Sequence, residues 1–186
     1  MTTSAKVTVH LMRHGEVHNP DRIVYGVPAD PRDAQEAQTA LDAVYQDLLE
    51  EGIPRIVTDY PTAELVKTAA NSFLATKISF INAMAHLCDT AGADVTVLAD
   101  AIGHDPRIGR RFLQAGVGFG GGCLPKDIRA LQASADLHGA VHLADLLSRV
   151  DSINREQRDR IVELARTHVG GEMSGRALTL LGAAFK

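Results

Sequence analysis

The spacing of apolar residues changes along the 186-residue chain, and this change separates two regions. Near the N-terminus, short β-branched runs between turn residues predict strands at residues 7–12, 22–27 and 54–58. Apolar side chains at helical spacing over residues 33–51 predict a helix that stops at Gly52. The first third is therefore predicted to be an α/β segment.

From residue 61 onward the apolar pattern is helical. No Gly or Pro occurs between Pro61 and Gly92, so this segment is predicted to form one helix, about 45 Å long at about 1.5 Å per residue. It is rich in Ala, and small side chains let another helix approach closely. We expect it to be a spine that also packs against a partner.

Shorter helices are predicted after the spine. One covers residues 94–102, with Asp94 as its N-cap and Gly103 at its end. Others cover residues 126–138 and about 140–168, and RALTLL at residues 176–181 predicts a strand that opens an incomplete βα unit. The predicted fold class is mainly α with α/β ends.

Composition narrows the function classes. Nineteen Lys and Arg against 23 Asp and Glu give a net charge of −4, which disfavours a nucleic-acid binder. No apolar run approaches the roughly 18 residues of a membrane span. Two cysteines are too few for a disulfide framework, so we expect a cytoplasmic protein that binds neither nucleic acid nor membrane.

Cys123 follows a segment with five glycines between Gly116 and Gly122. Such density indicates close approach of the main chain to a ligand. Pro125 suits the first turn of a helix, which places Cys123 at a helix N-terminus beside Lys126. The positive end of the helix dipole and the charge of Lys126 both favour the thiolate. The prediction is a nucleophile, and the alternative is a buried cysteine in a tight turn. Cys88, on the apolar face of the spine, is predicted to be core.

Lys67 and Asn71 lie four residues apart, on one face of the predicted spine and at the head of an apolar stripe. They need a polar partner, unless both lie at an exposed helix end. Asp127, close to the reactive cysteine, is a candidate for proton transfer. We assign no residue to a metal.

Five segments, in order, resemble the UDP-glucose 6-dehydrogenase family, within the wider group of UDP-glucose and GDP-mannose dehydrogenases. They are PDRIVYG (20–26), TAELVKTAANSFLATKISFIN (62–82), DPRIGRRF (105–112), GVGFGGGCLPKD (116–127) and LGAAFK (181–186). The resemblance implies oxidation of UDP-glucose to UDP-glucuronate with two NAD⁺ and one water. In that family a cysteine captures the aldehyde as a thiohemiacetal, and a second oxidation gives a thioester that water hydrolyses.

The resemblance also implies a role for each matching residue. Cys123 would be the nucleophile, Lys67 and Asn71 would stabilise the developing oxyanion, and Asp127 would help activate water. Lys126 would lie toward NAD. The substrate-binding positions implied are Phe119, Gly120, Arg107 (which would reach the substrate across a homodimer interface), Phe185 and Lys186.

The domain organisation implied is a helical central dimerisation domain with partial Rossmann-like pieces on either side. Its parts are residues 1–60 (1–19 phosphatase-like, 20–60 the end of an NAD-domain-like region), 61–140 (central, with Cys123), 141–175 (a connecting helix) and 176–186 (the first strand of a UDP-binding domain). The family's Gly-rich NAD fingerprint is absent from this sequence, so we expect the chain to have lost turnover.

Two other functions remain open. The first is a non-catalytic dimerisation module built on the spine. The second rests on LMRHGEVHNP at residues 11–20, which resembles the opening of the histidine phosphatase family, where Arg13 and His14 would belong to the phosphohistidine pocket. That family needs a second His and further Arg residues later in the chain, and no segment supplies them convincingly, so we favour a fragment over a working phosphatase site.

Overall fold

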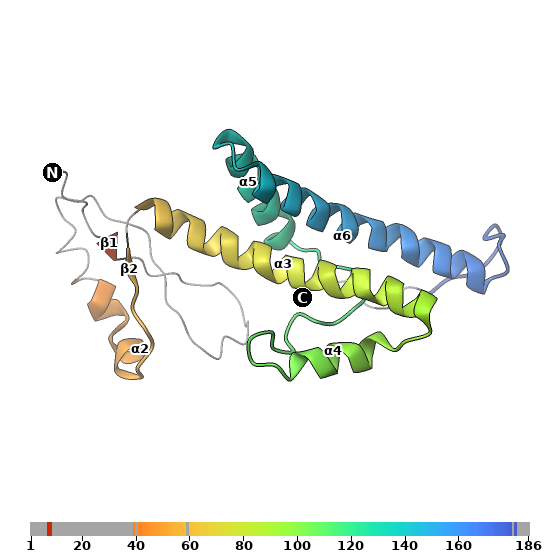
Figure 1. Ribbon diagram of the computed structural model, residues 1–186, viewed down its shortest axis with the longest axis horizontal. Helices are drawn as coiled ribbons and strands as arrows, with labels where there is room; N and C mark the ends of the chain where they lie inside the picture. Colours follow the sequence, from red (N-terminus) through yellow and green to blue (C-terminus); the bar gives the residue numbers. More distant parts are fainter. Residues whose placement is uncertain (1–6, 9–38, 40, 59, 180, 182–186) are drawn as a thin grey trace. The chain divides into compact units, whose positions relative to one another are not determined.

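The computed structural model describes residues 7–8, 39, 41–58, 60–179 and 181 (Figure 1). These residues form two compact units, and the division falls within one long helix. One unit comprises the described residues up to Lys67, and the other begins at Thr68. The phosphatase-like segment, the block at 20–26 and the strand predicted at 22–27 lie outside the described residues.

The first unit contains a small sheet and short helical segments. Strands β1 (Val7–Thr8) and β2 (Val57–Thr58) pair antiparallel, with Val7 opposite Thr58. Residues 41–44 are helical, and after a turn at Tyr45 the helix α2 (Gln46–Glu50) follows. The predicted strands at 7–12 and 54–58 and the helix at 33–51 are therefore confirmed over part of their described length.

The second unit is made of helices whose bounds agree with the sequence pattern to within about two residues. The 32-residue helix α3 (Tyr60–Ala91) is the predicted spine and passes through both units. It is followed by α4 (Val95–Gly103), α5 (Leu124–Leu137) and α6 (Val141–His168). The predicted N-cap is confirmed, because the Asp94 carboxylate accepts from the backbone N–H groups of Thr96 and Val97 at 2.7 and 3.3 Å.

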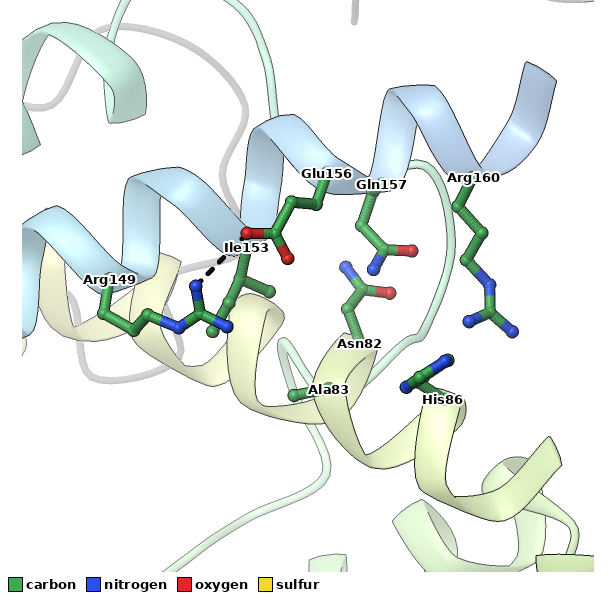
Figure 2. A pocket seen from close by; sticks show the side chains of 8 residues that line it. All are labelled: Asn82, Ala83, His86, Arg149, Ile153, Glu156, Gln157 and Arg160. Carbon is green, nitrogen blue, oxygen red and sulfur yellow. Dashed lines mark hydrogen bonds and ion pairs between the residues drawn. The ribbon is translucent and has the colours of Figure 1, made fainter. Parts of the chain in front are cut away.

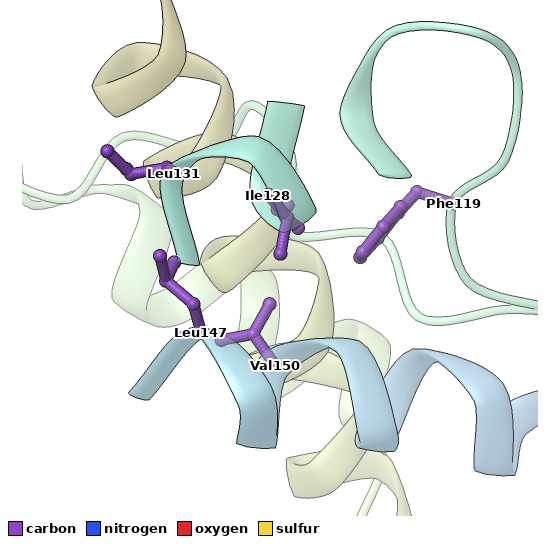
Figure 3. Close-up of a cluster of buried hydrophobic side chains, with 6 residues drawn as sticks. Phe119, Ile128, Leu131, Leu147 and Val150 are labelled. Atoms are coloured by element: carbon purple, nitrogen blue, oxygen red, sulfur yellow. The ribbon is translucent and has the colours of Figure 1, made fainter. Parts of the chain in front are cut away.

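Two hydrophobic clusters hold these helices together. The first joins α3, α5 and α6 to the loop before α5 (Figure 3); its buried members are Ala75, Phe119, Ile128, Leu131, Leu147 and Val150. The second joins α3 to α4 and the following loop through Ile81, Ala99 and Leu113. Ala75 and Ala99 are almost completely buried, so small side chains stand where α3 meets its neighbours.

The C-terminal strand prediction is wrong for the residues that the structure describes. Residues 176–179 and 181 form neither strand nor helix. A strand is stabilised by hydrogen bonds to a neighbouring strand, and in the described chain only β1 and β2 pair. The apolar residues of RALTLL favour a strand, but the described chain offers this segment no neighbouring strand to pair with. A UDP-binding domain beginning at residue 176 stays a prediction.

Candidate functional site

Cys123 is the N-cap residue of α5 and is exposed. Its backbone carbonyl accepts from the N–H of Asp127 at 2.9 Å, and Pro125 lies within the first turn. The predicted place at a helix N-terminus is confirmed, and the alternative of a buried cysteine is wrong. The positive end of the helix dipole favours an anion at this position, and solvent exposure leaves the thiol open to a reactant. Cys88 is buried, as predicted.

Asn71 and Asp127 form a buried hydrogen-bonded pair. Asn71 Nδ2 donates to Asp127 Oδ2 at 2.6 Å, and the two residues are only 6% and 3% exposed. The pair links α3 to the first turn of α5 across 56 positions of sequence. The expectation that Asn71 needs a polar partner is confirmed, and the alternative that it lies at an exposed helix end is wrong.

The same carboxylate has a cation at its other oxygen. Lys126 Nζ lies 3.1 Å from Asp127 Oδ1, and the Lys126 side chain is 64% exposed. Asp127 therefore stays close to Cys123 in a fixed orientation, with one oxygen facing the buried amide and the other facing an ammonium at the surface. The helix N-terminus adds a further stabilising influence on this carboxylate.

Lys67 lies on α3 one turn before Asn71 and is exposed. It belongs to the first compact unit, whereas Asn71, Cys123 and Asp127 belong to the second. Helical periodicity places Lys67 and Asn71 on one face of α3.

Arg107 lies in the loop after α4, and its side chain is 87% exposed. Its guanidinium donates to Asp105 Oδ2 at 2.6 Å, and its backbone N–H donates to Asp105 Oδ1 at 2.9 Å. The hydrogen bonds from Arg107 hold the pKa of the Asp105 carboxyl below its usual value and raise the pKa of Arg107. The loop therefore presents a charged, outward-facing arginine with a local carboxylate partner.

Phe119 lies in the core, and the substrate-binding role that the family resemblance implies for it stays a prediction. The residue is 7% exposed and packs in the first hydrophobic cluster (Figure 3). Gly120 differs, because a Cβ built there meets open space. A Cβ at Gly116 or Gly122 would also meet open space, while Phe119 anchors the segment. Phe185 and Lys186 lie outside the described residues.

Two buried asparagines contact this segment, and the sequence reading missed both. Asn154 on α6 pairs with the backbone of Phe119, and Asn82 on α3 accepts from the N–H of Gly116 at 2.8 Å. One signal could have revealed Asn154: it continues the apolar stripe of Leu147 and Val150, where an amide is costly unless its polar groups are bonded.

A cavity of about 300 Å³ lies between α3 and α6 (Figure 2). Its lining residues are Asn82, Ala83, His86, Arg149, Ile153, Glu156, Gln157 and Arg160. The charges pair locally, since Arg149 lies 3.2 Å from Glu156 and Arg160 pairs with Asp89. None of the residues predicted for catalysis or binding lines it.

The described residues contain no group of three or more His, Cys, Asp or Glu side chains able to hold a metal ion. Among them, no helix has the length and hydropathy needed to cross a membrane.

The helical domain therefore presents an exposed cysteine at a helix N-terminus, next to a buried amide–carboxylate pair. The model of the UDP-glucose/GDP-mannose dehydrogenase family, central domain, matches residues 61–156. The chain therefore belongs to the UDP-glucose/GDP-mannose dehydrogenase family of oxidoreductases.

Individual relatives agree with this family. The chain is 42% identical to UDP-glucose 6-dehydrogenase of Rickettsia felis over 90% of its own length and 36% of the relative's. It is 50% identical to UDP-glucose 6-dehydrogenase TuaD of Bacillus subtilis over 72% of its length and 28% of the relative's. A UDP-glucose dehydrogenase structure from Pyrobaculum islandicum superposes with a TM-score of 0.71 at 33% identity, covering 89% of this chain and 37% of that one. The matched part of the chain thus spans between 28% and 37% of the length of these proteins.

Proposed function

We propose that this chain carries the covalent step of a UDP-glucose 6-dehydrogenase. The observation that carries the proposal is an exposed cysteine at the N-terminus of α5, one turn from a buried Asn71–Asp127 pair. The Cys123 thiolate adds to the C6 aldehyde of the sugar nucleotide and forms a C–S bond. After oxidation of this adduct to a thioester, water attacks the carbonyl carbon, the C–S bond breaks, and a carboxylate leaves with the thiol restored.

NAD⁺ supplies the hydride acceptor for both oxidations. Lys126, the residue assigned to NAD⁺, is exposed beside Cys123 and carries a positive charge that suits a phosphate group. The chain's own groups then act on the sugar carbon. Lys67 supports negative charge on the reacting oxygen, as does the second N–H of the Asn71 amide, because an amide NH₂ has two donors and Asp127 takes one.

Asp127 fits the role of orienting the hydrolytic water. Its carboxylate is held at one oxygen by Asn71 and at the other by Lys126, so it keeps one orientation without rearrangement. A fixed carboxylate near the thioester carbon can accept a proton from water during attack. Gly120, beside open space, and the exposed Arg107 are proposed to contact the sugar nucleotide, with Phe185 and Lys186. Both cysteines are free thiols, which suits the cytoplasm.

We further propose that two copies pair through α3. Phe73, Phe80 and Leu87 are exposed and recur every seven residues along this helix, the repeat typical of helices that pack along a seam. This stripe of exposed apolar residues also favours the alternative function, a dimerisation module without catalysis. In such a dimer the exposed Arg107 is available to the site of the second copy.

The covalent step is tested by trapping. We would incubate the chain with the C6 aldehyde of UDP-glucose and measure the mass increase of the intact chain by native mass spectrometry, with UDP-glucose itself as the control for non-covalent binding. We expect the adduct on Cys123, none in Cys123→Ser, and an undiminished adduct in Cys88→Ala. Adduct formation that survives Cys123→Ser would refute the proposal, and a dimer that forms no adduct would support the non-catalytic alternative. NADH formation from UDP-glucose is measured in the same samples, and we expect none from the 186-residue chain.

A further inference from the structure

Asn154 occupies an unusual position in the middle of α6. It is only 2% exposed, yet it carries an amide on a helix face that also presents Leu147 and Val150 to the core. An amide buried among apolar side chains is unfavourable unless both of its ends are hydrogen-bonded. Both ends of Asn154 are satisfied by one residue of the glycine-rich segment.

The contact is a two-point clamp on the main chain. The N–H of Phe119 donates to Asn154 Oδ1 at 2.6 Å, and Asn154 Nδ2 donates to the Phe119 carbonyl at 2.9 Å. The side-chain amide thus replaces a strand neighbour for a residue that lies in a loop. Because both polar groups of the Phe119 backbone are used, this residue cannot shift without breaking two buried hydrogen bonds.

Gly118 makes the close approach possible. Its φ is +90°, and a Cβ built there would lie 2.2 Å from Asn154 Oδ1. A side chain at residue 118 is therefore excluded both by backbone conformation and by the position of Asn154. On the other side of the segment, Asn82 Oδ1 accepts from Gly116 N–H at 2.8 Å, so the loop is tied to α3 as well as to α6.

We propose that Asn154 is a positioning residue for Cys123, an inference that rests on the proposed thiol chemistry. Only Gly120, Gly121 and Gly122 separate the clamped Phe119 from Cys123. On the far side of Cys123, α5 is fixed by the buried Ile128, which packs in the same cluster as Phe119. The two fixed points, Phe119 and Ile128, restrict the conformations open to the three glycines between Phe119 and Cys123. They thereby determine where the Cys123 thiol lies relative to Asp127, which is in the same first turn of α5.

The experiment measures the clamp and the thiol separately in the full 186-residue chain. Amide hydrogen exchange, resolved at Phe119, reports on the clamp. The pH profile of Cys123 alkylation by iodoacetamide, read by peptide mass spectrometry, reports on the thiol. Asn154→Ala removes both hydrogen bonds, whereas Asn154→Asp keeps the acceptor for the Phe119 N–H and loses the donor. The matched control is Ser79→Ala, which removes a buried hydrogen bond from α3 to the Val150 carbonyl at 2.9 Å without touching the loop.

We expect Asn154→Ala to accelerate exchange at Phe119 about ten-fold, which corresponds to the loss of a buried hydrogen bond, and to change the rate at which Cys123 is alkylated at each pH. Asn154→Asp also buries a carboxylate against the Phe119 carbonyl, so it should change both readouts at least as much. If circular dichroism shows that one of the two variants does not fold, the other carries the test. Ser79→Ala should leave the Cys123 profile unchanged.

The outcomes separate the two ideas. An unchanged Cys123 profile in both Asn154 variants, or an equal shift in Ser79→Ala, overturns the positioning role. A wild-type Cys123 that already reacts as a free thiol overturns the proposed function, while faster Phe119 exchange would still establish the clamp.

Discussion

At the scale of single residues, the Asp127 carboxylate is the most constrained ionisable group of the site. We expect Asn71→Ala to lower the free energy of unfolding by about 1–3 kcal/mol, because it leaves a buried acceptor without its amide donor. Asp127→Asn should cost clearly less: the new amide oxygen still accepts from Asn71, and the lost ion pair is with the largely exposed Lys126. Urea denaturation of both variants measures the difference, and equal losses would contradict this account.

Asp105 gives a residue-scale prediction about pH. The hydrogen bonds from Arg107 lower the pKa of Asp105 below its usual 3.8. A carboxyl with a lowered folded-state pKa contributes stability that is present above 3.8 and lost as the pH falls through the folded value. We expect Arg107→Gln to return the pKa of Asp105 toward 3.8, measured by NMR titration of the carboxyl carbon. Since Arg107 is highly exposed, stability at neutral pH should hardly change. An Asp105 that titrates identically in both proteins would show that the pairing is absent in solution.

At the scale of elements, the N-cap of α4 can be tested in isolation from the site. Asp94 accepts from two backbone N–H groups that have no partner within the helix. Asp94→Ala should therefore destabilise the chain by about 1 kcal/mol, whereas Asp94→Asn, which caps equally well, should be nearly neutral. Thermal unfolding of the two variants distinguishes the cap from a simple loss of charge, because both remove the charge and only one removes the acceptor.

The helices and strands also show which parts of the fold could be predicted from the sequence. The bounds of α3 follow from the absence of Gly and Pro over thirty positions, and α6 stops just before Gly170, whose φ is +85°. Both are local effects. The strand predicted at 176–181 failed because strand formation depends on a partner elsewhere in the chain.

The candidate site likewise has features that local sequence predicts and contacts that it does not. Pro125 and the glycines placed Cys123 at a helix N-terminus correctly, because the cue lies within a few residues. That Asn71 would bond Asp127, and that Asn154 would clamp Phe119, are contacts across 56 and 35 positions. They depend on how the helices pack, which no local pattern contains.

At the scale of the whole molecule, α3 carries more apolar surface than the described part of the chain covers. Ala69, Phe73, Thr76, Phe80, Ala83 and Leu87 follow one another at spacings of four and three. That is the spacing at which one face of a helix meets a neighbour along its length. The opposite face of α3 already packs against α4, α5 and α6 through Ala75 and Ile81, so the exposed stripe is available to a second copy.

This arrangement predicts the outcome of one charge substitution. Phe80→Glu places a carboxylate in the centre of the stripe twice per dimer. If each ring contributes about 1.5 kcal/mol or more on burial, the dimer should weaken by about a hundred-fold or more. The matched control is Leu137→Glu, at a more exposed leucine on α5, away from the stripe. We expect sedimentation equilibrium to show a dimer for the wild type and Leu137→Glu and a monomer for Phe80→Glu, with circular dichroism unchanged in all three because both side chains are already exposed. A wild-type monomer, or a dimer that persists in Phe80→Glu, would mean that this stripe does not join two copies.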